Sequence, residues 1–332
     1  MKKATFYVPL LICLINLCGC KKENYITQEG NLVPKTVDQD PTLPSISING
    51  TMLHAETFGN ADSAMVVILH GGPGSDYRDL LNCKEFASQG YYVIFYDQRG
   101  SGLSKRHDKS SYSNEVMLDD LSAVIAHYRK SPTQKVFLLG HSWGATLATS
   151  FINKYGGAIN GAILAEPGGF TWSDIEGYVS RSRDVKITSE LMSDFLYADQ
   201  FITGKKDQQA ILDYKYALRF AAADGDKDNP IGNEGPLPFW RLGAVVNEAL
   251  FELGDKEKPD WTTHLREYNT KVLFVYSERN RAYGLDYAQK VSSAYPNVQL
   301  FKVNGAGHDM LSFPTGWSNF YPVALNYLNS LK

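Results

Sequence analysis

A serine flanked by glycines, at residues 140–144 (GHSWG), is the part of the sequence best suited to covalent chemistry. The motif follows the apolar segment 135–139 and precedes a helical stretch, so this Gly-x-Ser-x-Gly pattern falls in a strand–turn–helix context. Such a turn lifts the hydroxyl of Ser142 above the carboxyl edge of a sheet. It also places the backbone N–H of Trp143 at a helix start, where the helix dipole favours an oxyanion. We expect Ser142 to be a nucleophile and the Trp143 N–H to be one donor of an oxyanion hole.

Two glycine-rich segments could supply the other groups that a nucleophilic serine needs. Residues 70–74 (HGGPG) follow an apolar segment, and their glycines let backbone N–H groups face a ligand. We expect the Gly72 N–H to be the second oxyanion donor and His70 to have a structural hydrogen-bonding role. Residues 305–309 (GAGHD) follow the last apolar segment, so His308 could lie over the serine as general base.

Short apolar segments alternate with helical ones along much of the chain. Strands that alternate with helices predict a mainly parallel sheet with helices on both faces. A hairpin with its turn at Asn49-Gly50 is expected before them. The expected strands are 65–69, 91–96, 135–139, 161–165, 272–276 and 298–303, and the expected helices are 115–130, 142–155, 285–294 and 317–331.

The alternation is interrupted between residues 167 and 265. This block is rich in helix formers and aromatic residues and contains a loop-like piece at 229–238. We interpret 167–265 as a helical cap inserted after a strand, and 45–166 with 266–332 as the core that carries the sheet.

Four motifs in one order give the sequence a family resemblance. HGGPG, DQRGSGLS (97–104), GHSWG and GAGHD together resemble the α/β-hydrolase superfamily and, within it, the proline iminopeptidase group of serine aminopeptidases. The resemblance implies the α/β-hydrolase fold, with a mainly parallel eight-stranded sheet, helices on both faces and an inserted helical cap. It also implies the roles already expected for Ser142, His308, Gly72 and Trp143. Asp97 and Arg99, inside the second motif, are expected to hold their loop by charge-assisted hydrogen bonds.

The acid of the triad is the point at which the sequence departs from this group. Members carry an aspartate in a G-x-x-D pattern, where this chain has Asn280. An amide can orient a histidine but cannot stabilise an imidazolium by charge. Glu166, which ends the apolar segment 161–165, is our prediction for the acid. Glu278 and Asp286 stay open as alternatives, as does a structural or amine-binding role for Glu166.

A second departure concerns the cap. Proline iminopeptidases carry a tryptophan-rich, acidic cap segment that helps to hold the substrate amine, and the nearest piece here is 239–243 (FWRLG), with Glu248 and Glu252 further on. We therefore predict a serine hydrolase for a small acyl substrate or short peptide, with an aminopeptidase or amidase of proline iminopeptidase type as the leading activity. The alternatives are a carboxylesterase or lactonase, and a catalytically weak ligand-binding hydrolase.

The N-terminus has the pattern of a lipoprotein signal. Lys2 and Lys3 precede an apolar stretch at 6–17, which ends shortly before Gly19-Cys20 and resembles a bacterial lipobox. We predict that 1–19 is a signal peptide, that Cys20 is lipidated, and that 20–44 is a flexible tether to a membrane of the cell envelope, on its periplasmic or outer side. An ordinary secretory signal is the alternative.

Composition excludes several other classes. The 332 residues have a formal net charge of −3, so the basic excess of a nucleic-acid binder is missing. The sequence holds no HExxH, CxxC or P-loop pattern, and we expect neither a metal nor a cofactor. Without the signal and Cys20, Cys83 is the only cysteine, so no disulfide can form within the chain.

Overall fold

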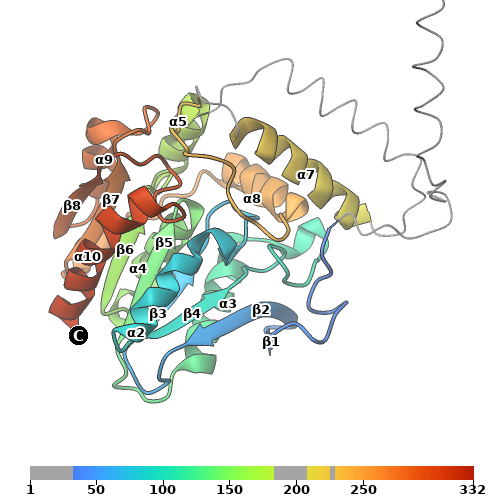
Figure 1. The fold of residues 1–332 in the computed structure, drawn as a ribbon, viewed down its shortest axis with the longest axis horizontal. Coiled ribbons are helices and arrows are strands. Elements are labelled where there is room, and N and C mark those ends of the chain that lie inside the picture. Colours follow the sequence, from blue (N-terminus) through green and yellow to red (C-terminus); the bar gives the residue numbers. More distant parts are fainter. Residues whose placement is uncertain (1–32, 183–207, 225–228) are drawn as a thin grey trace, which may run out of the picture.

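One eight-stranded sheet organises the molecule (Figure 1). The computed structural model describes residues 33–182, 208–224 and 229–332. The strands lie in the order β1-β2-β4-β3-β5-β6-β7-β8. They are β1 (Ser45–Ile48), β2 (Thr51–Phe58), β3 (Met65–Leu69), β4 (Tyr92–Tyr96), β5 (Val136–His141), β6 (Gly161–Ala165), β7 (Val272–Ser277) and β8 (Val298–Val303).

The sheet is mainly parallel, as predicted. Strands β4, β3, β5, β6, β7 and β8 pair in parallel, whereas β2 runs antiparallel to both of its neighbours, β1 and β4. The expected hairpin joins β1 to β2, and positive φ angles of 43° at Asn49 and 71° at Gly50 give it the backbone of a tight turn that matches the strand twist. Every residue of β3, β4, β5, β6 and β7 is buried, which explains why these strands are continuous apolar runs in the sequence.

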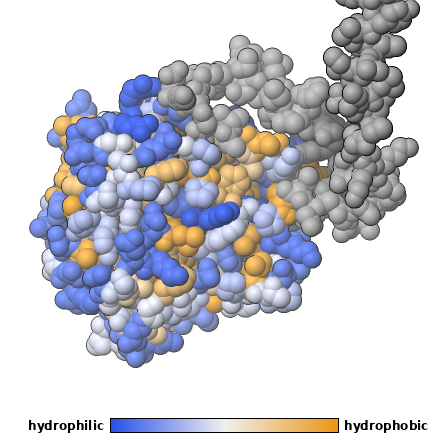
Figure 2. Space-filling model, viewed as in Figure 1, coloured by the Kyte–Doolittle hydropathy of each residue, from blue (hydrophilic) through white to orange (hydrophobic). Residues whose placement is uncertain are grey.

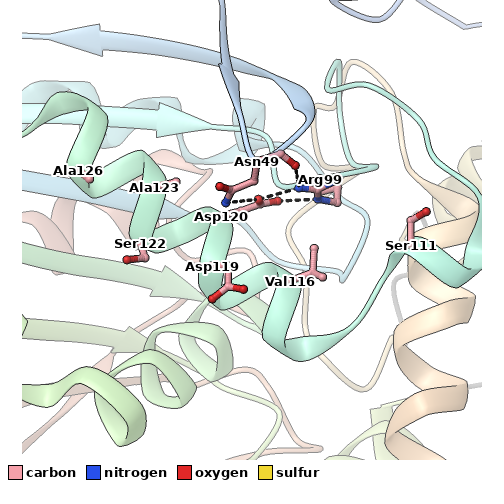
Figure 3. A pocket seen from close by; sticks show the side chains of 9 residues that line it. All are labelled: Asn49, Arg99, Ser111, Val116, Asp119, Asp120, Ser122, Ala123 and Ala126. Carbon is pink, nitrogen blue, oxygen red and sulfur yellow. Dashed lines mark hydrogen bonds and ion pairs between the residues drawn. The ribbon is translucent and has the colours of Figure 1, made fainter.

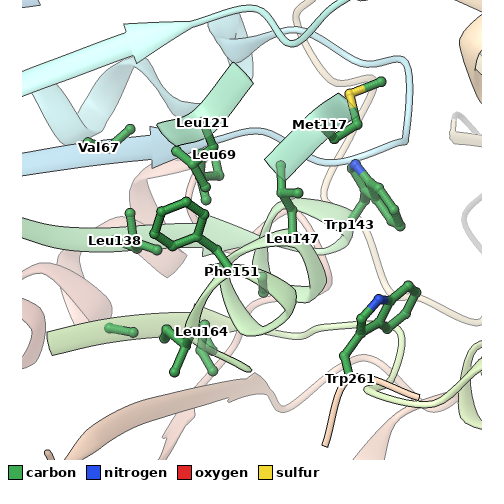
Figure 4. Close-up of a cluster of buried hydrophobic side chains, with 14 of the residues drawn as sticks. Val67, Leu69, Met117, Leu121, Leu138, Trp143, Leu147, Phe151, Leu164 and Trp261 are labelled. Carbon is green, nitrogen blue, oxygen red and sulfur yellow. The ribbon is translucent and has the colours of Figure 1, made fainter. Parts of the chain in front are cut away.

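Helices cover both faces of the sheet, and each face has its own hydrophobic core. Because successive side chains of a strand point to opposite faces, Leu138 packs in the core under α4 (Trp143–Tyr155), whereas Leu139 packs in the core that includes Phe320 of α10 (Pro314–Leu331). Figure 4 shows Leu147 and Phe151 of α4 against the sheet. One face carries α3 (Asn114–Tyr128), α4 (Trp143–Tyr155) and α9 (Gly284–Ser292), and the other carries α2 (Glu85–Ser88) and α10 (Pro314–Leu331).

The chain between β6 and β7 adds helices beyond the sheet edge. Its described part contains α5 (Trp172–Ser182), α7 (Gln208–Asp224) and α8 (Ala244–Glu257), which lie together above the carboxyl ends of the strands (Figure 1). We keep the name cap for residues 167–265; the exact domain boundaries stay a prediction, and residues 183–207 and 225–228 lie outside the described residues.

A buried carboxylate ties the cap to the core. Asp213 of α7 accepts hydrogen bonds from the Nε atoms of Arg106 (3.0 Å) and Arg241 (2.7 Å), and from the backbone N–H of Ala244 (2.9 Å). The Arg106 guanidinium also binds three carbonyl oxygens of the core loop at 101–104. Asp213 therefore holds α7, the start of α8 and a core loop in one ion-paired unit.

Removing this carboxylate is expected to destabilise the protein strongly. In Asp213→Ala two buried guanidinium groups lose their shared anion, so the free energy of unfolding should fall by about 3–5 kcal/mol. Urea unfolding measures the change. Asp119→Ala, at an exposed position of α3, is the control and should change stability by less than about 0.5 kcal/mol. Equal stability of the two variants would contradict the role given to Asp213.

The end of the expected tether packs against the body. Thr36 and Val37 are each 1% exposed, and the Val37 N–H donates to the carbonyl of Leu103 (2.8 Å). The Pro34 carbonyl accepts a hydrogen bond from Arg241. The chain is therefore fixed to the cap and core from Pro34 onward, which differs from the expectation of a tether that continues to residue 44.

The outer surface is mixed in polarity. Figure 2 shows hydrophilic residues over most of the visible face, with hydrophobic residues in small groups between them. In the ranges that the structure describes, no helix is both long enough and apolar enough to cross a membrane.

Candidate active site

Ser142 lies in a strained turn between β5 and α4. Its φ and ψ angles are 54° and −121°, a region that costs a non-glycine residue roughly 1–3 kcal/mol and that clusters at functional sites. The Ser142 N–H donates to the carbonyl of Ala165 at the end of β6 (2.9 Å), and its own carbonyl accepts from the N–H groups of Ala145 and Thr146. The turn is thereby held on both sides, and Ser142 itself is partly exposed at the sheet edge.

The glycines of the motif are required by close backbone approach. A Cβ atom at position 144 would lie 2.0 Å from the carbonyl oxygen of Leu69, and one at position 140 would lie 2.3 Å from the carbonyl oxygen of Gly144. Both distances are far below van der Waals contact with rigid backbone atoms. The tight turn that presents Ser142 therefore depends on glycine at each position.

Gly144→Ala is expected to disrupt this turn. The added methyl group must push α4 away from β3, so we expect a loss of about 1–3 kcal/mol of stability and a larger loss of activity, since Ser142 moves with the turn. Thermal unfolding and a serine-directed probe measure the two effects. Gly157→Ala, where a Cβ atom meets nothing within 4 Å, is the control. Wild-type behaviour of both variants would contradict the packing described.

His308 and Glu166 form a hydrogen-bonded pair next to this turn. The Nδ1–H of His308 donates to Oε2 of Glu166 over 2.7 Å. With the proton on Nδ1, the Nε2 atom of His308 is the free base. The loop of His308 is fixed to the serine motif, because His141 Nε2–H donates to the His308 carbonyl (2.7 Å) and the two rings lie 4.7 Å apart. Burial lowers the pKa of His141 to about 3, so His141 is neutral and serves as a donor.

Glu166 is completely buried, and its carboxylate is surrounded by hydrogen-bond donors. Oε1 accepts from both the backbone N–H and the hydroxyl of Ser277 (2.6 Å each). Oε2 accepts from Nδ2 of Asn280 (2.8 Å) in addition to His308. Burial pushes the pKa of Glu166 upward, but its contacts with His308 and Ser277 outweigh burial and leave the pKa below its usual value. Glu166 is therefore ionised where an imidazolium would form.

The other two acids considered for the triad lie elsewhere. Glu278 is exposed and accepts hydrogen bonds from Lys302 Nζ (2.9 Å) and the Gly305 N–H (2.8 Å). Asp286 is on the exposed side of α9. Of the three candidates the structure brings only Glu166 to His308, and Asn280, at the position where an acid was expected, lies beside it.

The predicted oxyanion donors are free to bind a ligand. In the described ranges, neither the Gly72 N–H nor the Trp143 N–H donates a hydrogen bond, and the Ser142 hydroxyl and His308 Nε2 are likewise unbonded. Gly72 has a φ of 116°, which a side chain would strain, and a Cβ atom at Gly71 would lie 3.2 Å from Cβ of Ser142. The glycine loop therefore lies directly against the serine.

Gln98 connects the glycine loop to the serine motif. Its backbone N–H donates to Nε2 of His70 (2.9 Å), its side-chain amide donates to the His70 carbonyl (3.0 Å), and its Oε1 accepts from the Trp143 indole (3.0 Å). His70 Nδ1–H donates to the Gly71 carbonyl (2.8 Å), and burial lowers the pKa of His70. His70 is thus a neutral structural residue.

Asp97 holds its loop in the manner expected from the sequence. Its carboxylate accepts from the N–H groups of Tyr77 (3.0 Å) and Leu103 (2.8 Å) and contacts Nδ1 of His54 (2.8 Å). Arg99 lies away from Ser142, where it lines a surface depression along α3.

Tyr178 is a residue of the site that the sequence did not single out. It comes from α5 of the cap, its hydroxyl accepts from Nδ2 of Asn280 (3.1 Å), and it lies 3.4 Å from Nδ1 of His308. The sequence places it among many cap aromatics, and only the fold distinguishes it.

The cap acids considered for amine binding are not at Ser142. Glu248 and Glu252 on α8 are exposed and pair with Lys109 at 3.2 and 2.6 Å. Trp240, in the tryptophan-containing segment, packs edge-on against Tyr77 and His54. These residues connect cap and core, so the described residues place no acid of that segment at the site.

A surface depression of about 610 Å³ lies along α3 (Figure 3). Asp120 in its wall accepts from Arg99 at 2.7 and 2.8 Å and from Asn49 at 3.0 Å, so Arg99 and Asp120 pair with each other. None of its lining residues belongs to the motifs of Ser142 or His308. Over the described ranges no group of three His, Cys, Asp or Glu residues could hold a metal ion.

Comparison with known proteins identifies the fold and the family of the chain. The crystal structures of VinJ (TM-score 0.60, 15% identity, 87% of this chain and 98% of that one) and of proline iminopeptidase from Mycobacterium smegmatis (TM-score 0.55, 17% identity, 86% and 97%) have a similar fold. The chain therefore has the predicted α/β-hydrolase fold. The family model described as "Serine aminopeptidase, S33" matches residues 60–231, just over half of the chain, and the protein belongs to this family.

Sequence similarity to curated relatives is restricted to part of the chain. A proline iminopeptidase of Thermoplasma volcanium is 34% identical over 104 residues, which cover 31% of this chain and 35% of that protein. The matched segment covers about a third to two fifths of the length of these relatives, for example 35% of one and 42% of another. The similarity supports a hydrolase of this family.

Proposed function

We propose that the protein is a serine hydrolase that cleaves a small acyl substrate. The observation that carries this proposal is the ionised Glu166 on Nδ1 of His308, next to a strained Ser142 and two unbonded backbone N–H groups. These are the nucleophile, base, orienting acid and oxyanion donors that acyl transfer requires.

The proposed reaction has two steps, formation of an acyl-enzyme and its hydrolysis. Ser142 Oγ attacks the acyl carbon while its proton passes to Nε2 of His308, and the N–H groups of Gly72 and Trp143 bind the resulting oxyanion. The bond to the leaving group then breaks, and the leaving group takes the proton from His308. A water molecule, deprotonated by Nε2, attacks the acyl-enzyme in the same manner and releases the acid and the free serine.

For the substrate we propose an amide or short peptide with a free N-terminal amine, as in proline iminopeptidases. The family description and the name of the Thermoplasma relative support this class. One observation favours an ester or lactone substrate instead: Glu248 and Glu252, the acids considered for holding an amine, are paired with Lys109 at the surface.

A panel of chromogenic substrates separates these two classes. The purified protein is assayed with prolyl, alanyl and leucyl p-nitroanilides, with their N-acetylated counterparts, and with p-nitrophenyl acetate and butyrate. We expect kcat/KM for the free-amine anilides to exceed that for the blocked ones by on the order of 100-fold, since a site built to pair a charged group rejects analogues that lack it. Equal rates with blocked anilides, or turnover of esters alone, would refute the aminopeptidase and support the carboxylesterase or lactonase.

We also propose that the protein is lipid-anchored through Cys20. Residues 1–32 lie outside the described residues, so the lipobox-like sequence is the support for this proposal. In bacterial cells fed a radiolabelled fatty acid, the wild type should be labelled and sediment with membranes. Cys20→Ser should be unlabelled, and label retained in that variant would refute the anchor.

A further inference from the structure

The loop that carries Gly72, one of the two predicted oxyanion donors, is held by two different parts of the molecule. The core holds its first half, because Gln98 Nε2 donates to the His70 carbonyl (3.0 Å) and His70 Nδ1–H donates to the Gly71 carbonyl (2.8 Å). The residues that follow Gly72 are held instead by the cap segment 239–247. The position of this oxyanion donor therefore depends on both parts.

The start of α8 holds two successive carbonyl groups of the loop. Asn247 Nδ2 donates to the Pro73 carbonyl (2.7 Å), and the Gly243 N–H donates to the Gly74 carbonyl (2.6 Å). Because a carbonyl oxygen can only accept, the NH2 group of the Asn247 amide must face Pro73. The two backbones are in contact here, since a Cβ atom at Gly74 would lie 2.4 Å from the Gly243 carbonyl oxygen. The loop cannot move away from α8 without breaking both hydrogen bonds.

Asp76 adds a second connection between the loop and the cap. Its side chain is completely buried, and Oδ2 accepts from the backbone N–H groups of Trp240 (2.6 Å) and Arg241 (3.0 Å). Arg78 Nη1 donates to the Phe239 carbonyl (2.9 Å). Three successive cap residues are thus bound to the segment that follows the glycine loop.

These contacts reach the Gly72 N–H through the tight turn of the backbone. A Cβ atom at Gly72 would lie 2.5 Å from the nitrogen of Gly74 and 2.7 Å from that of Ser75, so Gly72 lies directly against the residues that the cap holds. Pro73 and Gly74 are buried, whereas Gly72 is exposed. A displacement of residues 73–75 would therefore carry the Gly72 N–H with it. An oxyanion donor is effective only when it lies about 2.7–3.1 Å from the developing charge.

We propose, on the basis of the hydrolase function proposed above, that Asn247 and Asp76 are positioning residues of the oxyanion hole, which hold the Gly72 N–H in place from the cap. They act through the backbone turn at 72–75 and not on the reacting atoms. The other donor, the Trp143 N–H, is at the start of α4 in the core. The oxyanion hole is therefore complete only when the cap is bound to the glycine loop.

The decisive experiment removes the hydrogen bond from Asn247. Hydrolysis of p-nitrophenyl butyrate is measured for wild type, Asn247→Ala and Asn247→Asp, the last of which keeps the size of the side chain but cannot donate. The assay is run at pH 8, because burial and the charge of Asp97 raise the pKa of Asp76 to about 7. We expect kcat to fall by about 10-fold in both variants with KM changed by less than about 2-fold. This loss is smaller than the 10²–10³-fold loss that follows removal of a whole oxyanion donor.

A transition-state analogue gives a readout that a merely structural role would not move. An alkyl trifluoromethyl ketone adds to Ser142 Oγ, the proton passes to His308, and the ketone oxygen becomes an oxyanion in the hole. The inhibition constant of this ketone should rise in Asn247→Ala by the same factor as kcat/KM falls. An unchanged inhibition constant, or a loss that appears in KM alone, would overturn the positioning role.

Asn153→Ala is the matched control. Asn153 of α4 also connects the core to the cap, because its Oδ1 accepts from the His264 N–H (2.7 Å) and its Nδ2 donates to the Thr263 hydroxyl (3.1 Å). In the described ranges its side chain makes no hydrogen bond to residues 70–78. We expect a similar loss of thermal stability but kcat and the inhibition constant within about 2-fold of wild type. Equal losses of kcat in Asn153→Ala and Asn247→Ala would overturn the proposal.

A further measurement does not depend on the choice of substrate. A fluorophosphonate places its phosphoryl oxygen in the same hole, so its rate of reaction with Ser142 should fall by at least about 5-fold in Asn247→Ala and in Asp76→Asn. The asparagine at 76 replaces one carboxylate oxygen by an NH2 group that cannot accept, and if this variant does not fold, the Asn247 variants still decide. Labelling of folded Asn247→Ala at the wild-type rate would overturn the inference.

These outcomes are separable from a failure of the proposed function. Wild-type turnover that Ser142→Ala abolishes establishes the hydrolase independently of position 247, so wild-type behaviour of the Asn247 variants would then overturn this inference alone. Folded wild-type protein with neither turnover nor probe labelling would overturn both.

Discussion

Glu166→Gln is expected to lower kcat by on the order of 10⁴-fold while the protein stays folded. The substitution keeps the shape of the side chain but removes the charge that opposes the imidazolium. It also places an NH2 group or a neutral oxygen against Nδ1 of His308, where a carboxylate now accepts at 2.7 Å. With the NH2 group against Nδ1, the proton of His308 moves to Nε2, which is then no longer the free base; with the neutral oxygen there, the proton stays on Nδ1 but the imidazolium has no opposing charge. Steady-state hydrolysis, with circular dichroism as a check of folding, measures the loss.

Glu278→Gln is the matched control for this result. Glu278 also follows β7, but it is exposed and paired with Lys302 and the Gly305 N–H, so its loss should change kcat less than about 3-fold. A large loss in Glu278→Gln together with a small one in Glu166→Gln would contradict the assignment of the acid.

The charge of Glu166 should also make the stability of the fold depend on pH. Its pKa in the folded state lies below the ordinary value of 4.5, so its ionisation stabilises the fold above that value. This contribution is lost as the pH falls through the lower, folded-state pKa. Between these two pH values wild type should therefore lose stability more steeply than Glu166→Gln. Parallel stability curves would show that the carboxylate is not held as described.

Ser142→Ala is expected to have the largest effect on activity, a loss on the order of 10⁶-fold in kcat. The alanine removes the nucleophile, and its methyl group fits the space of the hydroxymethyl group. Substrate binding and folding should be nearly unchanged, because the Ser142 hydroxyl has no hydrogen bond in the described ranges. Single-turnover kinetics with an ester substrate gives the rate of acylation directly.

The control for the serine is Ser122→Ala, an exposed position of α3. It should retain wild-type kcat within about 2-fold. Residual turnover above about 1% of wild type in Ser142→Ala would contradict a covalent mechanism through this residue.

The fold was predictable where burial leaves a pattern in the sequence. β3 and β6 begin and end where the apolar segments do, because strands covered on both faces must be apolar throughout. The bounds of β8 also match the prediction, although β8 is an edge strand in which Val303 alone is buried. The 3₁₀ helix at Tyr77–Lys84 and the short α2 after it were not predicted. Their buried apolar residues, Tyr77, Leu80, Cys83 and Phe86, recur every three positions, which is the 3₁₀ period and not the 3.6-residue spacing of an α-helix. Asp97 holds the start of the 3₁₀ helix by accepting from the N–H of Tyr77.

The catalytic residues could be predicted from the sequence because each of them follows a strand. Ser142, His308 and Glu166 each follow a strand, so the parallel sheet brings them to one edge. The donors around Glu166 were not predictable. Tyr178 and Asn280 are 102 positions apart in the chain, and only the packing of α5 over the loop after β7 brings them together.

The measurement that tests the account most directly is labelling by a fluorophosphonate probe, which reacts only with an activated serine. Wild type, Ser142→Ala, Glu166→Gln and Glu278→Gln are compared by initial rate of labelling. We predict rapid labelling of wild type and Glu278→Gln, none of Ser142→Ala, and labelling slowed by at least about 100-fold in Glu166→Gln. Folded wild-type protein that does not label, or labelling that survives in Ser142→Ala, would contradict the serine hydrolase proposed for this protein.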